Sequence, residues 1–168
     1  MNLKEQLITT YEGFEKQGHA IFAVTLSTFV KSKKIAESPR MQHLWDQHFI
    51  RRVRRRIPEY LPLHHDFIIE LSPPQRVLDS IDSQGIPTYR TECYYHYHGL
   101  VAVKAEHSHR IWKDGRLNPA LDGSLRSFQS AGKYRPFKIP SFDFAPVRKV
   151  EAWGTYMFKD QNTAFSFS

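Results

Sequence analysis

Alternating polar and apolar residues mark residues 92–103 as a strand whose two faces differ in chemistry. Side chains on a β-strand point alternately to opposite faces. Such alternation is typical of a sheet that packs one face on a core and leaves the other open. His96 and His98 share the polar face, where two imidazoles can hold one metal ion. The apolar face is predicted to carry Cys93, Tyr95, Tyr97, Val101 and Val103, and the polar face Glu92, Tyr94, His96 and His98.

Hydrophobic periodicity elsewhere predicts further helices and strands. Leu3, Leu7 and Tyr11 recur at helical spacing in a leading segment, residues 1–18, and Ser38-Pro39 is typical of a helix start. The patterns predict helices over residues 3–16, 39–57, 106–113 and 147–160, and strands over residues 21–27, 65–72 and 137–144. They also predict a connection longer than a minimal hairpin over residues 75–91 and an exposed loop over residues 114–136.

The order of these elements predicts an α+β protein with a central antiparallel sheet and flanking helices. Without the leading helix, the elements read βαββαβ followed by a terminal helix. The strand over residues 92–103 is expected to return antiparallel to the strand before it, which brings Glu70 near His96 and His98 on the polar face. The chain has 168 residues, enough for one domain with a real core, so we expect a single domain over residues 1–168.

The composition indicates an intracellular protein with a polyanionic partner. The formal net charge is +7, and the run Arg51-Arg52-Val53-Arg54-Arg55-Arg56 is densely basic. Lysine and arginine gain affinity for phosphates by displacing counterions. The single cysteine, Cys93, rules out an internal disulfide and fits a reducing compartment. No apolar run approaches the roughly 20 residues that span a bilayer, so we expect a cytoplasmic protein with no membrane partner.

A tyrosine and a lysine near the end of the last predicted helix complement the histidine pair. Tyr156 and Lys159 stand at i and i+3, so both are predicted to project to one side of the helix, next to Val150, Trp153 and Met157. A phenol is a poor nucleophile near neutral pH because its pKa is about 10. A nearby metal ion that polarises a phosphate, and an ammonium that stabilises the phenolate or the phosphate, would favour phosphoryl transfer.

Three motifs in this order resemble those of the HUH endonuclease superfamily, in particular its replication initiator (Rep) branch. The first is the strand Phe22-Ala23-Val24-Thr25-Leu26-Ser27, with its Thr-Leu-polar ending. The second is His96-Tyr97-His98-Gly99. The third is Tyr156-Met157-Phe158-Lys159-Asp160, preceded by Pro146-Val147-Arg148 and Trp153. The motifs span nearly the whole chain, and the resemblance implies a ferredoxin-like or RRM-like HUH fold.

The resemblance also implies a metal site. His96 and His98 would bind a divalent cation, Mn²⁺ or Mg²⁺, together with an acidic residue of the neighbouring strand, and Glu70 matches that position best. This chain departs from many members by inserting residues 73–91 between the glutamate and the histidines. Glu92 therefore competes as third ligand, since i, i+4 keeps it on the same face, although it would lie about 13 Å from His96 at about 3.3 Å per residue.

A structural zinc site is the alternative chemistry for this region. It would use Cys93 with His96 and His98. Cys93 is predicted to lie on the opposite face of the strand from the histidines, so geometry disfavours the zinc site.

The function implied by the resemblance is origin-specific nicking and joining of single-stranded DNA, which initiates rolling-circle replication in a prokaryotic host or a virus-infected cell. Tyr156 would attack a phosphodiester to give a 5′-phosphotyrosine, and Lys159 would assist. The expected partner is a single-stranded origin, with or without a hairpin; a host helicase and polymerase are further candidates, and the chain is expected to be a monomer or a weak dimer. The residues predicted to contact DNA are Arg51, Arg52, Arg54, Arg55, Arg126, Arg135 and Lys138.

Two alternatives remain at this point. A single-tyrosine transposase or plasmid relaxase of the same superfamily would share the chemistry, although the Tyr-x-x-Lys spacing favours Rep. A non-catalytic RRM-like module is the alternative of a different class, because an open sheet that exposes Tyr94 would suit base stacking.

Overall fold

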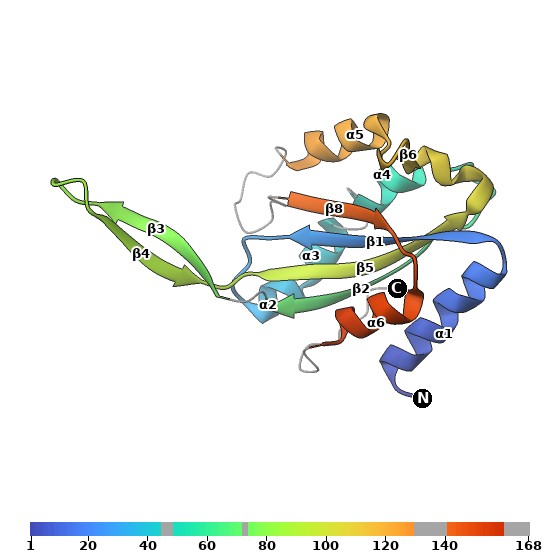
Figure 1. Ribbon diagram of the computed structural model, residues 1–168, viewed down its shortest axis with the longest axis horizontal. Helices are drawn as coiled ribbons and strands as arrows, with labels where there is room; N and C mark the ends of the chain where they lie inside the picture. Colours follow the sequence, from blue (N-terminus) through green and yellow to red (C-terminus); the bar gives the residue numbers. More distant parts are fainter. Residues whose placement is uncertain (45–48, 72–73, 130–140, 160–168) are drawn as a thin grey trace.

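A four-stranded antiparallel sheet lies at the centre of the computed structural model, which describes residues 1–44, 49–71, 74–129 and 141–159 (Figure 1). Its strands are β1 (His19–Ser27), β2 (His64–Leu71), β5 (Tyr95–Lys104) and β8 (Ser141–Pro146), in the spatial order β2-β5-β1-β8. β5 pairs with β2 on one side and with β1 on the other, and β8 pairs with the outer side of β1. The strand that carries the two histidines is therefore a central strand.

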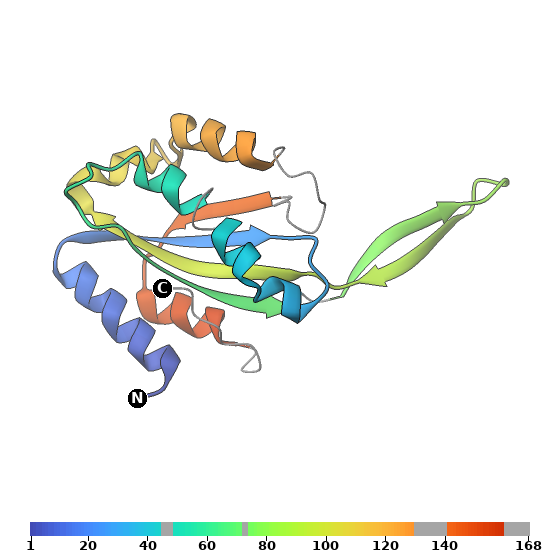
Figure 2. The same ribbon diagram turned by 180° about the vertical axis from the view of Figure 1, so that it is seen from behind.

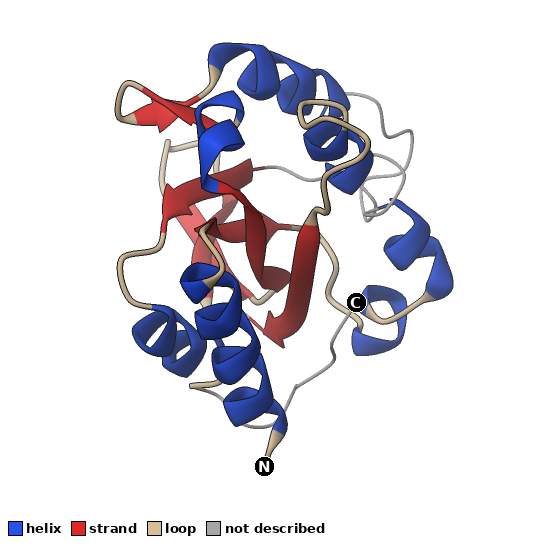
Figure 3. Cartoon of the chain, turned by 90° about the vertical axis from the view of Figure 1, so that its right-hand side faces the viewer, coloured by secondary structure: helices blue, strands red, loops and turns tan. Residues whose placement is uncertain are grey.

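Helices cover both faces of this sheet (Figures 1, 2 and 3). α1 (Leu3–Lys16) and α6 (Val150–Met157) pack on one face. The short α2 (Lys33–Ala36), α3 (Pro39–Leu44), α4 (Arg51–Arg54) and α5 (Pro119–Gln129) lie on the other. The predicted α+β class, with a central antiparallel sheet and flanking helices, is confirmed. The prediction of an open polar face was wrong, because α1 and α6 supply apolar side chains that bury much of it.

The leading helix forms where the sequence predicts it, and its apolar side packs on the sheet. Asn2 caps the first turn, since its side-chain oxygen accepts from the backbone N–H of Glu5 while the Glu5 carboxylate accepts from the N–H of Asn2. Tyr11 is fully buried, and its hydroxyl donates to the carbonyl oxygen of Leu100 in β5 at 3.0 Å. This bond ties the helix to the strand of the histidines.

A glycine lets α6 approach α1 closely. A Cβ at Gly154 would lie 2.5 Å from Cγ1 of Ile8, well inside ordinary contact distance. The two helices therefore pack as one layer over the sheet, and α1 supports the helix that carries Tyr156.

Gly99→Ala is expected to destabilise the fold, because Gly99 leaves room for an aromatic ring on the next strand. Gly99 is paired with Phe67 of β2, and a Cβ at position 99 would lie 2.2 Å from Cδ1 of Phe67. Phe67 is buried and meets Phe49 edge to face, so its ring has little freedom to move. Overpacking of this kind costs about 1–3 kcal/mol.

Chemical denaturation of Gly99→Ala would measure this cost. Gly123→Ala in α5 is the matched control, since a Cβ there meets nothing within 4 Å, and it should leave the unfolding free energy unchanged or raise it by about 0.5–1 kcal/mol. Equal stability of the two variants would contradict the packing role of Gly99.

The predicted connection after β2 is itself a hairpin. β3 (Gln75–Ile81) and β4 (Pro87–Glu92) form a separate two-stranded antiparallel ribbon, which extends away from the rest of the protein (Figures 1 and 2). Asp82 holds its turn, because its side-chain oxygen accepts from the N–H groups of Gln84 and Ile86. Glu92 therefore ends β4 instead of opening the histidine strand, which begins at Tyr95.

The prediction of an exposed loop over residues 114–136 was wrong for residues 114–129, the part that the structure describes. β6 (Trp112–Lys113) and β7 (Arg116–Leu117) form a small hairpin, and α5 follows. Asn118 caps α5, because its side-chain oxygen accepts from the N–H of Ala120, and Pro119 takes the first helical position. Leu121 and Leu125 lie one turn apart and are buried. The polar composition concealed this amphipathic pattern.

Several predicted elements are shorter than expected. The helix predicted over residues 39–57 corresponds to α3 and α4, and residues 45–48 between them lie outside the described residues. A 3₁₀ helix, Ala105–Arg110, replaces the helix predicted over residues 106–113. Of the last predicted strand, residues 137–140 lie outside the described residues, and β8 begins at Ser141. Within the described ranges, no helix is both long and apolar enough to cross a membrane.

Candidate functional site

Two neighbouring strands bring two imidazoles and one carboxylate together. Glu70 in β2 is paired directly with His96 in β5, and His98 lies on the same face of β5. Oε2 of Glu70 is 3.1 Å from Nε2 of His96 and 2.8 Å from Nε2 of His98, and the two Nε2 atoms are 2.8 Å apart. Glu70 and His98 are each only 2 % exposed. The structure thus brings together the three residues predicted as metal ligands, and the cluster could hold a metal ion.

The triangle of donor atoms fits a divalent cation. Ligands at right angles and about 2.1 Å from an octahedral ion lie about 3 Å apart, close to the 2.8–3.1 Å sides of this triangle. Two imidazoles and one carboxylate leave other positions open for water or substrate. Burial lowers the pKa of His96 to about 4 and that of His98 to about 3, with a further contribution from the Lys159 ammonium. Both rings are therefore neutral near pH 7, the form that binds metal.

Thr25 orients His98 from the other neighbouring strand. β1 pairs Thr25 with His98, and Oγ1 of Thr25 lies 3.0 Å from Nδ1 of His98. Metal binding through Nε2 requires the proton on Nδ1, which then donates to the threonine hydroxyl. Thr25 of the first motif thus fixes the orientation of a candidate metal ligand, a role that its sequence pattern alone does not reveal.

Thr25→Val is expected to weaken Mn²⁺ binding by about 10-fold or more, because valine keeps the shape of threonine but accepts no hydrogen bond from His98. Isothermal titration calorimetry would measure the affinity. Ser27→Ala is the control: Ser27 lies two residues along β1, opposite His96, and its loss should leave the affinity unchanged. An unaltered Mn²⁺ affinity in Thr25→Val would show that His98 needs no support from β1.

Tyr156 and Lys159 lie beside the cluster at the end of α6. The helix ends at Met157, so Lys159 lies just beyond it, but its N–H donates to the carbonyl oxygen of Tyr156 and keeps the two residues within one turn. Nζ of Lys159 is 3.5 Å from Oε1 of Glu70 and 4.2 Å from the centroid of the Tyr156 ring. Burial acts to lower the pKa of Lys159, but Glu70 and Tyr156 outweigh it and raise that pKa. A charged ammonium therefore bridges Glu70 and Tyr156.

Aromatic packing holds Tyr156 in place. Its ring stacks on Trp153, with centroids 5.0 Å apart, and meets the ring of His98 at 5.1 Å. The indole N–H of Trp153 donates to the carbonyl oxygen of Gly99 at 3.1 Å, which ties α6 to the histidine strand. Tyr156 is still 42 % exposed, so its side chain is accessible to a substrate. The sequence predicted Trp153 as part of a packed stripe and of the pattern before the third motif, but the spacing of residues does not reveal this hydrogen bond.

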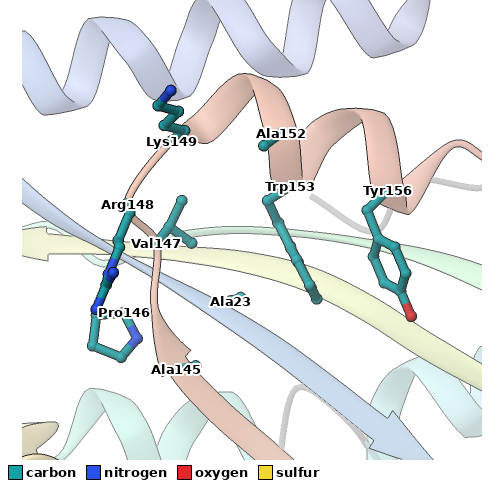
Figure 4. A pocket seen from close by; sticks show the side chains of 9 residues that line it. All are labelled: Ala23, Ala145, Pro146, Val147, Arg148, Lys149, Ala152, Trp153 and Tyr156. Atoms are coloured by element: carbon teal, nitrogen blue, oxygen red, sulfur yellow. The ribbon is translucent and has the colours of Figure 1, made fainter.

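A groove of about 580 Å³ adjoins Tyr156, between the start of α6 and the strands β1 and β8 (Figure 4). Trp153 and Tyr156 project side by side from α6, and alanines on the strands leave space below them (Figure 4). Aromatic rings and cations along one groove are typical of sites for single-stranded nucleic acid. The residues that line the groove include Ala23, Ala145, Arg148, Lys149, Trp153 and Tyr156.

Glu92, the competing third ligand, is held elsewhere. Its Oε1 accepts from Nζ of Lys31 at 2.7 Å and from Nε of Arg90 at 2.8 Å, and these bonds lower the pKa of its carboxyl group. The prediction that Glu92 shares a strand face with His96 was wrong, because Glu92 ends β4 and His96 lies in β5. Among the described side chains, the cluster comprises Glu70, His96 and His98 without Cys93, so the structure gives no support to the zinc alternative.

Three arginines of the basic run bond to the protein itself, and one of them, Arg56, donates to the carbonyl oxygen of Ala120 at 2.7 Å. The side chain of Arg52 donates to the carbonyl oxygen of Ser124, and that of Arg54 to the carbonyl oxygens of Pro58 and Glu59. These bonds hold α4 to the segments around it. α4 packs on the sheet face opposite to α6, so the run lies away from the metal cluster.

The other residues predicted to contact DNA are also not brought to the cluster. Arg51 and Arg55 are exposed on and next to α4, and Arg126 on α5 forms an ion pair with Asp122 at 2.9 Å. Arg135 and Lys138 lie outside the described residues. DNA contact by these residues stays a prediction.

Comparison with known proteins identifies no relative: no protein-family model matches the chain, and no curated protein matches it significantly. The function of the site is therefore inferred from its geometry and its motifs.

Proposed function

We propose that this protein nicks and rejoins single-stranded DNA at a replication origin, in a metal-dependent reaction through a covalent tyrosine intermediate. One observation carries the proposal: an accessible tyrosine and a lysine ammonium lie against a triangle of two imidazoles and one carboxylate. The order of the three motifs supports the Rep branch and the initiation of rolling-circle replication. The charge of +7 supports a polyanionic substrate.

In the proposed reaction, the hydroxyl oxygen of Tyr156 attacks the phosphorus of a phosphodiester. A bond forms between phosphorus and the tyrosine oxygen, the bond from phosphorus to the 3′-oxygen breaks, and the phenol proton ends on the leaving 3′-oxygen. The products are a 5′-phosphotyrosine and a free 3′-hydroxyl. Because the phosphotyrosine preserves a phosphodiester bond, a 3′-hydroxyl can attack it in turn and join the strand.

The neighbouring residues supply charge and orientation. Lys159 contacts the Tyr156 ring and Glu70, where its ammonium favours both the phenolate and a phosphate. Glu70, His96 and His98 would hold the cation, Mn²⁺ or Mg²⁺. When bound there, the cation would polarise a phosphate oxygen and offset the charge that develops on phosphorus.

Other functions are less well supported. A non-catalytic module that stacks bases on its sheet needs an open face, whereas helices pack on both faces of this sheet. A transposase or plasmid relaxase of the same superfamily would share the tyrosine chemistry, and the spacing of Tyr156 and Lys159 favours Rep over the transposase.

Covalent capture of DNA tests the proposal. The protein is incubated with Mn²⁺ and a pool of single-stranded oligonucleotides of random sequence, labelled at the 3′ end so that the label stays on the fragment that Tyr156 retains. A labelled band at the size of protein plus DNA is expected on a denaturing gel. Oligonucleotides labelled at the 5′ end should instead give free, shortened fragments that a polymerase extends. No adduct with Mn²⁺, or an equal adduct with EDTA, would refute the proposal.

The groove beside Tyr156 predicts where the strand binds. Arg148→Ala with Lys149→Ala should weaken binding of a single-stranded oligonucleotide and reduce the salt slope of log Kd by about 1.4, about 0.7 for each lost phosphate contact. Arg51→Ala with Arg55→Ala removes the same charge from the opposite face of the sheet and serves as the comparison. Fluorescence anisotropy over a range of salt concentrations measures both. A larger effect of Arg51 and Arg55 would place the strand on α4.

A further inference from the structure

The β3–β4 ribbon has an apolar face, formed by Leu78, Ile81, Pro87 and Tyr89. Residues directly opposite each other in a sheet share a face, and the register pairs Leu78 with Tyr89 and Ile81 with Pro87. On β4, Pro87 and Tyr89 are two residues apart, so both pairs lie on one side. The ribbon is therefore amphipathic from the Leu78–Tyr89 pair to the Ile81–Pro87 pair.

A β-bulge keeps these side chains together. Leu78 and Ile81 are three residues apart and would point to opposite sides of a regular strand. The register shifts between Leu78 and Ser80, which leaves Asp79 without a partner in the ladder and returns Ile81 to the side of Leu78. The irregularity therefore lengthens the apolar face.

The opposite face is polar. Arg90 donates to Asp79 at 2.6 Å and to Glu92 at 2.8 Å, and Glu92 also accepts from Lys31 at the base of the ribbon. Ion pairs of this kind suit a face in contact with water. Contact with water is therefore unfavourable only for the apolar face, which a binding partner would bury.

The apolar face is exposed in the isolated chain. The ribbon extends away from the sheet and its helices (Figures 1 and 2). Leu78 is 48 % exposed, Ile81 62 % and Tyr89 44 %. A two-stranded ribbon alone is only marginally stable in water, and clustered exposed apolar side chains mark interaction surfaces.

The charge of the ribbon argues against a nucleic acid as the occupant of this face. Residues 75–92 contain two arginines and three carboxylates, one net negative charge, in a chain of net charge +7. A duplex or single strand of DNA would be poorly attracted by such a surface. We propose that the apolar face docks on the same face of a second copy of this chain, so that two ribbons pack antiparallel in a two-fold symmetric dimer.

The antiparallel arrangement matches the charges along the ribbon. Arg76 lies at the base, where its guanidinium contacts the Tyr89 ring at 3.8 Å, and Asp82 lies at the tip. A two-fold axis places each Arg76 near the Asp82 of the other copy. It also places the two basic bodies at opposite ends, roughly 20 Å or more apart, beyond the Debye length of about 8 Å at physiological salt.

The small size of the face sets the strength of the dimer. Seven residues at about 3.3 Å each make a strand of about 23 Å. Two such ribbon faces bury roughly 500–1,000 Å² in total, which is below the usual size of a stable interface. The dimer is therefore weak, with a Kd of roughly 10–100 µM.

Sedimentation velocity of the full chain from about 1 µM to about 500 µM tests this dimer. The wild type should shift from monomer to dimer over this range. Leu78→Ser with Ile81→Ser should raise the Kd at least about tenfold, because it removes the centre of the apolar face. Val77→Ser is the matched control, since Val77 is paired with Arg90 on the polar face and should not change the Kd.

Thermal unfolding separates association from folding, since all variants should melt like the wild type at low concentration. A wild type that stays monomeric at every concentration would overturn the proposal. So would a dimer that Leu78→Ser with Ile81→Ser leaves unchanged. If the wild type is monomeric and the same double variant instead weakens binding of a single-stranded oligonucleotide, the ribbon contacts DNA and the dimer is refuted.

Discussion

Tyr156→Phe is expected to abolish the covalent adduct with single-stranded DNA, a loss of at least about 1,000-fold. Phenylalanine removes the attacking oxygen but keeps the ring that stacks on Trp153 and meets His98. The fold, the Mn²⁺ affinity and the affinity for an oligonucleotide should therefore stay close to those of the wild type. The 3′-labelled pool on a denaturing gel measures the adduct, and calorimetry measures Mn²⁺ binding.

Tyr60→Phe is the matched control for this experiment, because it removes the hydroxyl of another exposed tyrosine, at 82 % exposure. This variant should form the adduct as the wild type does. An adduct that persists in Tyr156→Phe would assign the nucleophile to another residue. Strand cleavage without any adduct in the wild type would instead point to hydrolysis by water.

Glu70→Gln is expected to lower the Mn²⁺ affinity at least about 100-fold. Glutamine has nearly the shape of glutamate, so it preserves packing in a position that is 2 % exposed, but it removes the negative charge from the triangle with His96 and His98. The covalent adduct should fall with the affinity and recover in part at high Mn²⁺ concentration. Calorimetry and the same gel measure the two effects.

Glu92→Gln is the control that decides between the two candidate ligands. Glu92 is also a buried carboxylate, at 6 % exposure, but its partners are Lys31, Arg90 and Tyr94. This variant should keep its Mn²⁺ affinity. If Glu92→Gln loses the metal and Glu70→Gln keeps it, the geometry of the cluster has been misinterpreted.

The cluster of Glu70, His96 and His98 was predictable because strand pairing obeys simple periodicity. Alternation in β5 places His96 and His98 on one face, and an antiparallel return of the chain brings Glu70 of β2 to that face. The fold class followed from the order of elements in the same way. Neither inference needed the length of the segment between the two strands.

Other features could not be predicted, because they depend on contacts between distant segments. The burial of His98 follows from α6 packing on the sheet, and the bond to Thr25 needs the register of β1 against β5. α5 escaped prediction because polar residues surround Leu121 and Leu125. The hairpin over residues 75–92 escaped it because an amphipathic ribbon with a bulge loses the strict period of two.

The close approach of Gly154 to Ile8 makes the position of the proposed nucleophile depend on the beginning of the chain. α6 rests on α1 as well as on the sheet, and α1 is itself fastened to β5 by Tyr11. A protein that lacked residues 1–18 would retain every motif residue and yet lose the support beneath Tyr156. The proposed reaction therefore depends on an intact amino-terminal helix as well as on Glu70, His96 and His98.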